Sequence, residues 1–482
     1  MKKATKIVCT IGPSSDYEKT LKKMYEAGMN VARLNCSHSN YEYMHDIITK
    51  VRGLNDHIAI MMDLKGPEIR TGELSDEIEL EEGQEIEFTN EPIEGDNKQI
   101  TINYDKLQTV EKGSKILIDD GLIECDVISQ TKNGVRANVI NAGILGSKKT
   151  VTIWGHDVDL PFLSQKDKED IEFAIKNDVS FIAASFVREA SEVNEIRNML
   201  SEHNSKTKII SKIEHARGVK NFDKILEASD GIMIARGDLG VEMPLEKVPY
   251  LQRDMIRKCR LAGKPVIVAT QMLESMKSSP RPTRAEVSDV AQAIVQGTDA
   301  VMLSGETASG KYPVKSIRVM AKIAKEYEHN LISHLEKEAR AKQDNEISLF
   351  ITEAAYEASE SLKTKAILVP TESGFTARHV SKFRPGCPIY TSSRDQVIVR
   401  QLQLSWGVIP FHYKITHKYR DNMINSLVTK VYNENHIDTD DRIVVTAGFK
   451  LAKEGYTNLI EIYNVKDIIG RIENNEIKPT NE

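Results

Sequence analysis

Two neighbouring segments of the sequence end apolar runs with charged side chains. Lys208–Glu214 carries Lys212 and Glu214, and Gly231–Gly240 carries Asp238. Residues two apart on a strand point to the same side, so Lys212 and Glu214 share a face. The spacing of Glu214 and Asp238 matches one strand–helix unit, which puts the two carboxylates at adjacent strand ends. Two carboxylates beside a lysine predict a Mg²⁺ or Mn²⁺ site next to a fixed positive charge, suited to a phosphorylated anion.

Each of these segments also has a purely structural interpretation. Lys212 and Glu214 could be an ion pair, since a charge in an apolar strand is costly without a partner. Gly237 and Gly240 around Asp238 would equally serve a tight turn. If the strands belong to a barrel, their C-terminal ends are where catalytic groups lie, which favours the functional interpretation.

Other polar side chains follow other apolar runs. Arg33, Asn35 and Ser37 alternate, so they share one face of an extended segment. Arginine suits bidentate phosphate contact, and the Asn and Ser oxygens suit a second cation or a hydrogen-bond network; a capped loop is the alternative. Thr270 and Ser304 follow two later runs, where they could bind phosphate or relay a proton, or could N-cap helices.

A further hydroxyl-rich loop lies near the C-terminal end of the sequence. Thr371, Ser373, Gly374 and Thr376 follow an apolar run and open a helical pattern. Hydroxyls and backbone N–H groups at a helix start can hold an anion, although ordinary capping explains the same residues. Basic residues nearby, at 378 and 382, favour an effector phosphate.

The elements that must position these side chains alternate between strands and helices. Eight short apolar runs are each followed by a segment with helical spacing, and this number and order predict a (β/α)8 TIM barrel. The eight runs are 5–11, 30–34, 58–64, 181–186, 208–213, 231–235, 265–269 and 300–303.

Two stretches depart from the barrel pattern. Residues 72–155 contain short alternating segments punctuated by glycines, which predicts an inserted β-barrel lid domain. Residues 345–482 again alternate helices and strands, which predicts a C-terminal α/β open-sheet domain with helices on both faces. The catalytic barrel is then 1–71 plus 156–340.

Composition narrows the class of protein. The 482 residues suffice for two to four domains, and the net charge of -6 carries no concentrated basic block, so neither nucleic acid nor a membrane is an expected partner. The five cysteines are scattered without paired spacing, which predicts reduced thiols and a cytoplasmic location.

Seven motifs occur together in order, and through them the chain closely resembles the pyruvate kinase family over essentially its whole length. Neither the extra C-terminal domain of some bacterial members nor the N-terminal extension of animal members is expected. The motifs are Ala32–His38, Asp63–Gly72, Ile210–Glu214, Ile234–Glu242, Ala269–Met276, Pro280–Glu286 and Met302–Ala308.

The resemblance implies the last step of glycolysis, phosphoenolpyruvate plus ADP to pyruvate plus ATP, by a homotetramer with Mg²⁺ and K⁺. It implies catalytic and substrate-binding roles for Lys212, Arg33, Gly237, Asp238 and Thr270, with Ser304 in proton delivery. The same resemblance implies Mg²⁺ on Glu214 and Asp238, K⁺ on Asn35, Ser37, Asp63 and the Leu64 carbonyl, and nucleotide on Arg70 and Lys166. A sugar phosphate or AMP would be the effector of the C-terminal domain, which would also form a subunit interface.

Departures from the family pattern qualify these expectations. Cys36 and Leu64 replace the usual Phe and Thr, and Glu68 stands where K⁺-independent members carry Lys, which predicts K⁺ dependence. His215 and Arg217 also differ, and Gly448–Gly455 is poorer in glycine than the family's effector loop. Two rival functions are a Mg²⁺-dependent lyase of 2-oxo acids, which needs no nucleotide lid, and a regulatory binder with a decayed active site.

Overall fold

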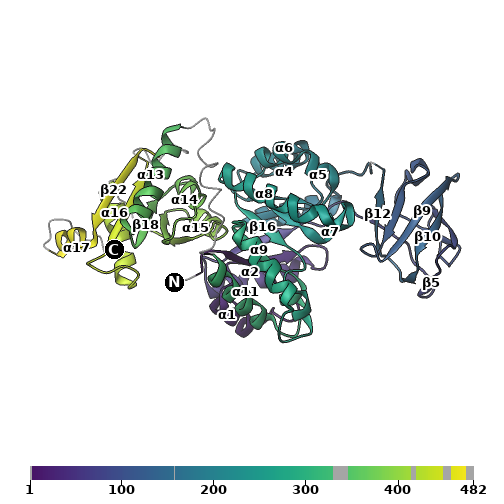
Figure 1. Ribbon diagram of the computed structural model, residues 1–482, viewed down its shortest axis with the longest axis horizontal. Helices are drawn as coiled ribbons and strands as arrows, with labels where there is room; N and C mark the ends of the chain where they lie inside the picture. The colour runs from purple at the N-terminus through teal and green to yellow at the C-terminus, as the bar shows by residue number, and fades with distance from the viewer. Residues whose placement is uncertain (1–2, 157, 329–345, 414–419, 449–456, 474–482) are drawn as a thin grey trace.

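The computed structural model describes residues 3–156, 158–328, 346–413, 420–448 and 457–473. Three main β-sheets lie in a row along the molecule, with the barrel in the middle, the inserted sheet at one end and the C-terminal sheet at the other (Figure 1). Among these residues no helix has the length and apolar character that crossing a membrane requires.

The central sheet is a closed barrel of eight parallel strands in the order β1-β17-β16-β15-β14-β13-β3-β2, as the sequence predicted. Apolar residues fill both faces of these strands, since side chains line the barrel interior and helices cover the outside. The strands are β1 (Lys6–Thr10), β2 (Val31–Asn35), β3 (Ala59–Asp63), β13 (Phe181–Ala184), β14 (Lys208–Ile213), β15 (Gly231–Ala235), β16 (Val266–Ala269) and β17 (Ala300–Leu303).

The barrel helices begin and end where local chemistry favours it. Ser164 and Thr283 form capping boxes at the starts of two helices, and Gly28 and Gly263 end two others in the left-handed conformation. The helices are α1 (Glu18–Ala27), α2 (Tyr41–Leu54), α3 (Gln165–Lys176), α4 (Ala190–Glu202), α5 (Ala216–Lys220), α6 (Phe222–Ala228), α7 (Arg236–Glu242), α8 (Val248–Ala262), α9 (Arg284–Val295), α10 (Gly305–Ala308) and α11 (Pro313–Tyr327).

The inserted domain, called the lid below, is a curled mixed sheet. Its seven main strands run in the order β4-β12-β8-β9-β10-β6-β7, which leaves β4 and β7 as the two edge strands. A single bridge, between Thr71 and Ile102, connects these edges. The sheet therefore closes into the predicted barrel through one pair of residues. The lid strands are β4 (Ile69–Arg70), β5 (Ile78–Leu80), β6 (Glu85–Thr89), β7 (Gln99–Thr101), β8 (Lys115–Ile118), β9 (Ile123–Gln130), β10 (Gly134–Asn141), β11 (Gly143–Leu145) and β12 (Thr150–Trp154).

The C-terminal sheet is open, in the order β20-β19-β18-β21-β22, with only β22 antiparallel. Apolar clusters on its two faces pack against helices, as expected. Its elements are α13 (Glu346–Leu362), β18 (Ala366–Pro370), α14 (Phe375–Ser381), β19 (Ile389–Ser393), α15 (Gln396–Leu402), β20 (Val408–His412), α16 (Arg420–Asn433), β21 (Arg442–Ala447), β22 (Leu459–Asn464) and α17 (Val465–Glu473). The exact domain boundaries stay a prediction.

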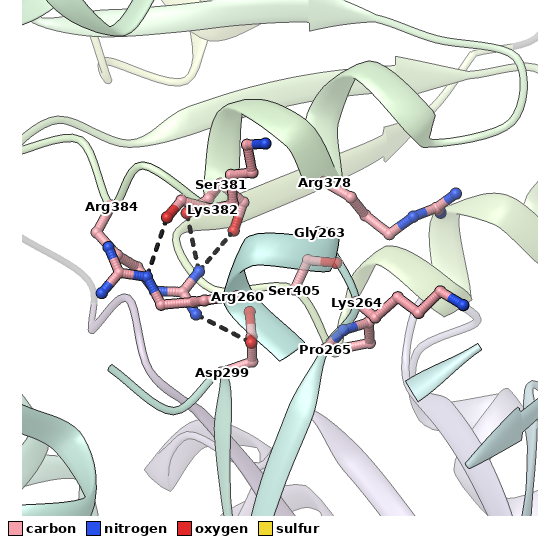
Figure 2. Close-up of a pocket in the computed structure, with 10 residues that line it drawn as sticks. All are labelled: Arg260, Gly263, Lys264, Pro265, Asp299, Arg378, Ser381, Lys382, Arg384 and Ser405. Carbon is pink, nitrogen blue, oxygen red and sulfur yellow. Dashed lines mark hydrogen bonds and ion pairs between the residues drawn. The ribbon is translucent and has the colours of Figure 1, made fainter. Parts of the chain in front are cut away.

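The C-terminal domain packs on the N-terminal ends of the barrel strands. Leu404 is fully buried within the apolar cluster that fills the barrel interior. Arg384 donates to the Gly297 carbonyl at 2.9 Å. It also lies 2.9 Å from the Asp299 carboxylate, and Arg260 of α8 donates to the Lys382 carbonyl at 3.1 Å (Figure 2). The floor of the barrel is therefore closed, and its open mouth lies at the other end.

Candidate active site

Lys212 is the centre of a charged cluster at the C-terminal end of β14. Its Nζ lies 2.9 Å from Glu214 Oε1 and 3.1 Å from Asp63 Oδ1, and donates to Ser185 Oγ at 2.7 Å. Burial alone would lower the pKa of Lys212, but Asp63 and Glu214 raise it above its usual value. The ammonium group is therefore charged and fixed in direction.

Arg33 stands on the other side of Asp63. Its Nε lies 2.6 Å from Asp63 Oδ2, and Nη1 donates to Thr10 Oγ1 at 2.9 Å. Asp63 is only 1% exposed; burial alone would raise its pKa, but Arg33 and Lys212 lower it. Asp63 therefore stays ionised and holds two cations side by side at the barrel mouth. Sequence reasoning gave Arg33 and Asp63 separate roles, whereas they form one ion pair.

The two predicted metal ligands lie on neighbouring elements. β14 and β15 pair, as expected from the spacing, but Asp238 lies in the first turn of α7, not at a strand end. Burial and the nearby Asp238 raise the pKa of Glu214 to about 7, while the Phe186 N–H, which donates to Oε2 at 2.7 Å, lowers it in part. Burial also raises the pKa of Asp238. Both carboxylates would be stabilised by a cation.

The candidate metal site consists of two carboxylates, Glu214 and Asp238. Among the described residues no three or more His, Cys, Asp or Glu side chains converge on one point. This fits Mg²⁺, which proteins hold through one or two carboxylates while other positions stay with water and phosphate oxygens. Glu214 and Asp238 are buried, and their pKa values are raised even though Lys212 lies beside Glu214, so this donor set fits a divalent cation.

Thr270 and Ser304 follow β16 and β17 as predicted. Thr270 Oγ1 accepts from the Gly237 N–H at 2.8 Å and donates to the Ala269 carbonyl at 2.6 Å. Thr270 (φ 67°) and Gln271 (φ 54°) both occupy the left-handed region, where non-glycine residues are strained, a feature that clusters at functional sites. The Ser304 side chain makes no capping hydrogen bond to α10, so the capping alternative fails there.

Of the residues predicted to bind a second cation, Asn35 and Leu64 are neighbours of Asp63, and Ser37 is exposed. Asn35 is the register partner of Asp63 across β2 and β3. Its Oδ1 accepts from the Ser37 N–H at 3.1 Å, the capped-loop contact that was the alternative, and the Leu64 carbonyl accepts from Ser185 Oγ at 2.7 Å. All donors are oxygens, one of them a carboxylate and one a backbone carbonyl, a set that fits a hard monovalent cation.

The two basic residues predicted to bind nucleotide come from different elements. Arg70, in β4, lies 2.9 Å from Glu68 and donates to the Lys148 carbonyl at 2.8 Å. Lys166, in α3, pairs with Asp170 and lies 4.5 Å from the centroid of the Tyr41 ring. Both side chains are partly exposed, so they remain accessible to a ligand.

The lid faces the barrel mouth across a narrow cavity of about 90 Å³. β12 and Asp120 of the lid line one side, and Asp238 and Val241 of α7 line the other. The charge of Asp120 contributes to the raised pKa of Asp238. The lid is therefore close enough to act on the site.

The C-terminal hydroxyl loop is satisfied by local contacts. Thr371 Oγ1 accepts from the Gly374 N–H at 3.0 Å, and Ser373 Oγ accepts from the Phe375 N–H at 3.4 Å. Thr376 Oγ1 shares a hydrogen bond of 2.6 Å with Thr457 Oγ1. Local hydrogen bonds thus account for these hydroxyls, although none of them caps α14, whose N-cap residue is Gly374. The effector site stays a prediction. In the segment 448–455, residues 449 onward lie outside the described residues.

Sequence reasoning missed three members of the site. Thr10, Ser185 and the Phe186 N–H contact Arg33, Lys212 and Glu214 respectively. Thr10 ends β1 and Ser185 directly follows β13, so the rule that strand ends carry the polar groups of a barrel would have found both. Phe186 (φ 54°) could not be recognised from the sequence, because it contributes its backbone N–H and not its side chain.

The site is a closed barrel whose mouth holds Lys212 and Arg33, each paired with Asp63, beside two buried carboxylates and under a lid. This arrangement belongs to the class of barrel enzymes that act on anionic substrates. Comparison with known proteins narrows this class. The family models described as "Pyruvate kinase, barrel domain" and "Pyruvate kinase, alpha/beta domain" match residues 2–317 and 350–463.

Relatives named "Pyruvate kinase" support the same assignment. One from Sporosarcina psychrophila is 46% identical over 97% of this chain and 81% of its own length. Another, from Staphylococcus aureus (strain MRSA252), is 45% identical over 96% of this chain and 81% of its own. The chain belongs to the pyruvate kinase family and has the enzymatic function of a pyruvate kinase.

Proposed function

We propose that the barrel mouth transfers the phosphoryl group of phosphoenolpyruvate to ADP, giving pyruvate and ATP in the last step of glycolysis. The observation that carries the proposal is the position of Lys212, fixed between Asp63 and Glu214 at the C-terminal strand ends. Phosphoryl transfer needs positioning and charge neutralisation more than covalent chemistry, and a buried ammonium group supplies both.

Lys212 and Arg33 bind the anionic substrate in this proposal. Arg33 contacts the phosphate, and Lys212 stabilises both the phosphoryl group in transfer and the enolate that it leaves behind. Because Asp63 already fixes the Arg33 and Lys212 side chains, these two side chains need no reorganisation when charge develops on the substrate. Gly237, Asp238 and Thr270 complete the substrate contacts.

Glu214 and Asp238 would hold Mg²⁺, or Mn²⁺ in its place. When bound, the ion supplies positive charge that offsets the charge on the phosphoryl oxygens. The raised pKa values of both carboxyl groups support the assignment, because a cation would stabilise the ionised pair.

Asn35, Ser37, Asp63 and the Leu64 carbonyl would hold K⁺. Position 64 contributes its backbone oxygen, so a leucine side chain does not abolish the site. Glu68 supports K⁺ dependence, because its carboxylate is paired with Arg70 and offers no positive charge that could replace the ion.

The hydroxyl groups of Thr270 and Ser304, which follow β16 and β17, protonate the enolate carbon. Thr270 donates to the Ala269 carbonyl and accepts from the Gly237 N–H, which holds its hydroxyl in place. Thr270, or a water that it orients, delivers the proton, and Ser304 completes the relay.

Arg70 and Lys166 bind the nucleotide beneath the lid, which excludes water during transfer. The C-terminal domain binds a sugar phosphate or AMP through the loop 371–376. The chain assembles as a homotetramer in the cytoplasm, partly through the C-terminal domain. All five cysteines are free, which is consistent with a reducing compartment.

The test measures pyruvate from phosphoenolpyruvate with lactate dehydrogenase and NADH. We expect pyruvate only when ADP and Mg²⁺ are both present. Omission of either one is the control for the other, and pyruvate formed without ADP would instead support a lyase. A panel of sugar phosphates and AMP in the same assay identifies the effector, and an unchanged rate with every member would contradict an effector site of this class.

A further inference from the structure

Trp154 joins the lid directly to the helix that carries Asp238. It is the last residue of β12, and its indole Nε1–H donates to the Val241 carbonyl of α7 at 2.5 Å. Val241 lies three residues after Asp238, on the same seven-residue helix. One hydrogen bond therefore spans the boundary between the lid and the barrel.

α7 is placed where a pull from the lid would reach the site. It follows β15 directly, and in Figure 1 it lies on the side of the barrel that faces β12. At its other end the Gly237 N–H donates to Thr270 Oγ1 at 2.8 Å. The helix thus joins Trp154, Asp238 and Thr270 through its own backbone.

The lid and α7 also form opposite walls of the same cavity. Residues of β12 line one side, and Asp238 and Val241 line the other. Asp120, in the turn between β8 and β9, lines the same cavity as Asp238. A shift of the lid relative to α7 would change the width of this cavity and the charge around Asp238.

We propose that Trp154 is a positioning residue for the phosphoryl transfer, whose bond to Val241 couples lid position to the placement of the metal ligand Asp238. The inference rests on the metal and nucleotide sites proposed above. Trp154 touches no substrate in this arrangement, and it acts through α7. Because only the indole N–H supplies the donor, a phenylalanine keeps the ring but loses the link.

The kinetic test compares Trp154→Phe with Trp406→Phe, the same change at the only other tryptophan of the sequence. Trp406 follows α15 in the C-terminal domain and lies beside Arg384. That domain and the lid are at opposite ends of the molecule (Figure 1). We expect Trp154→Phe to raise the KM for ADP and the Mg²⁺ concentration for half activation together. Each should rise roughly 2- to 10-fold, the range of one net hydrogen bond, with kcat changed less than either.

The spectroscopic test uses Trp406→Phe, which leaves Trp154 as the single tryptophan. We expect Mg²⁺ without nucleotide to shift Trp154 emission, with the same midpoint as the activation of turnover. NaCl at matched ionic strength is the control. A tryptophan that only packs the lid would not respond to the metal ion.

The outcomes separate this inference from the function on which it rests. Glu214→Gln that keeps full Mg²⁺ activation would refute the metal site itself. If Glu214→Gln loses activation, but Trp154→Phe behaves like Trp406→Phe and emission ignores Mg²⁺, the coupling through Trp154 is wrong. Circular dichroism on both tryptophan variants checks that the domains stay folded.

Discussion

Replacing Lys212 with methionine removes an ammonium group that lies between Asp63 and Glu214 while keeping the length of the side chain. The variant leaves both carboxylates buried, each only 1% exposed. It also removes the charge that would balance the phosphoryl group. We therefore expect two separate effects, one on turnover and one on stability.

The effect on turnover is set by the loss of one preorganised charge. Removing a single electrostatic stabiliser costs roughly 10²–10³ in rate, or about 2.7–4 kcal/mol of transition-state stabilisation. Lys212 makes close contacts to two carboxylates, at 2.9 and 3.1 Å, so its position is well fixed and the full range applies.

The loss of stability in Lys212→Met should be smaller than the loss of two buried ion pairs suggests. Removing one partner of a buried ion pair costs about 3–5 kcal/mol. Here Asp63 keeps Arg33 at 2.6 Å, and Glu214 can take up a proton because burial has already raised its pKa to about 7. We expect a cost near the lower end, about 3 kcal/mol.

The assay is the lactate dehydrogenase reaction at saturating phosphoenolpyruvate, ADP and Mg²⁺, with urea unfolding in parallel. Lys208→Met is the matched control, since Lys208 lies on the same strand and pairs with Asp230 at 3.0 Å, far from the mouth. It should keep its activity and lose about 0–1 kcal/mol of stability. Near-normal turnover of Lys212→Met would refute the proposed role of Lys212.

Three further predictions concern ions and pH. Replacing K⁺ by Na⁺ at constant ionic strength should lower turnover, because Glu68 is bound to Arg70 and supplies no positive charge; equal rates would contradict this. The Mg²⁺ concentration for half activation should rise as pH falls below about 7, because Glu214 must lose its proton to bind the ion. The rise should be up to about tenfold per pH unit. A constant half-activation concentration between pH 6 and 8 would exclude Glu214 as a ligand. Burial lowers the pKa of Lys382 from 10.5 to about 8, so the unfolded chain binds its proton more tightly. The contribution of Lys382 to stability should therefore rise with pH from about 8 to 10.5, so the stability of the protein relative to Lys382→Met in urea unfolding should increase over that range. A difference between the two that stays constant with pH would contradict this.

Much of the barrel could be predicted because its strands are buried on both faces. Such strands appear as short apolar runs, and the polar residue that ends each run marks the mouth. Lys212, Glu214 and Thr270 were found by this logic alone. The lid was recognised by the loss of helical spacing, since alternating short strands with glycine turns have a different period.

Pairings between distant segments could not be predicted. Arg33 and Asp63 were given different ligands, because spacing along the chain says nothing about which cation a carboxylate will meet. The Phe186 N–H contacts Glu214 through the backbone, and no pattern of side chains reveals such a contact. Leu404, which fills the barrel floor, comes from a different domain, and its burial depends on how the two domains dock.

The pairing of β1 with β17 has a consequence for synthesis on the ribosome. β1 also pairs with β2, but its other edge is covered only by residues 300–303. About 290 residues separate the two strands, so that edge stays unpaired for about 15–60 s at the usual rate of translation. The lid begins and ends with paired strands, Arg70 opposite Thr150, so it can fold as soon as it emerges. Chaperone binding during translation should therefore concentrate on the first strand of the barrel and spare the lid.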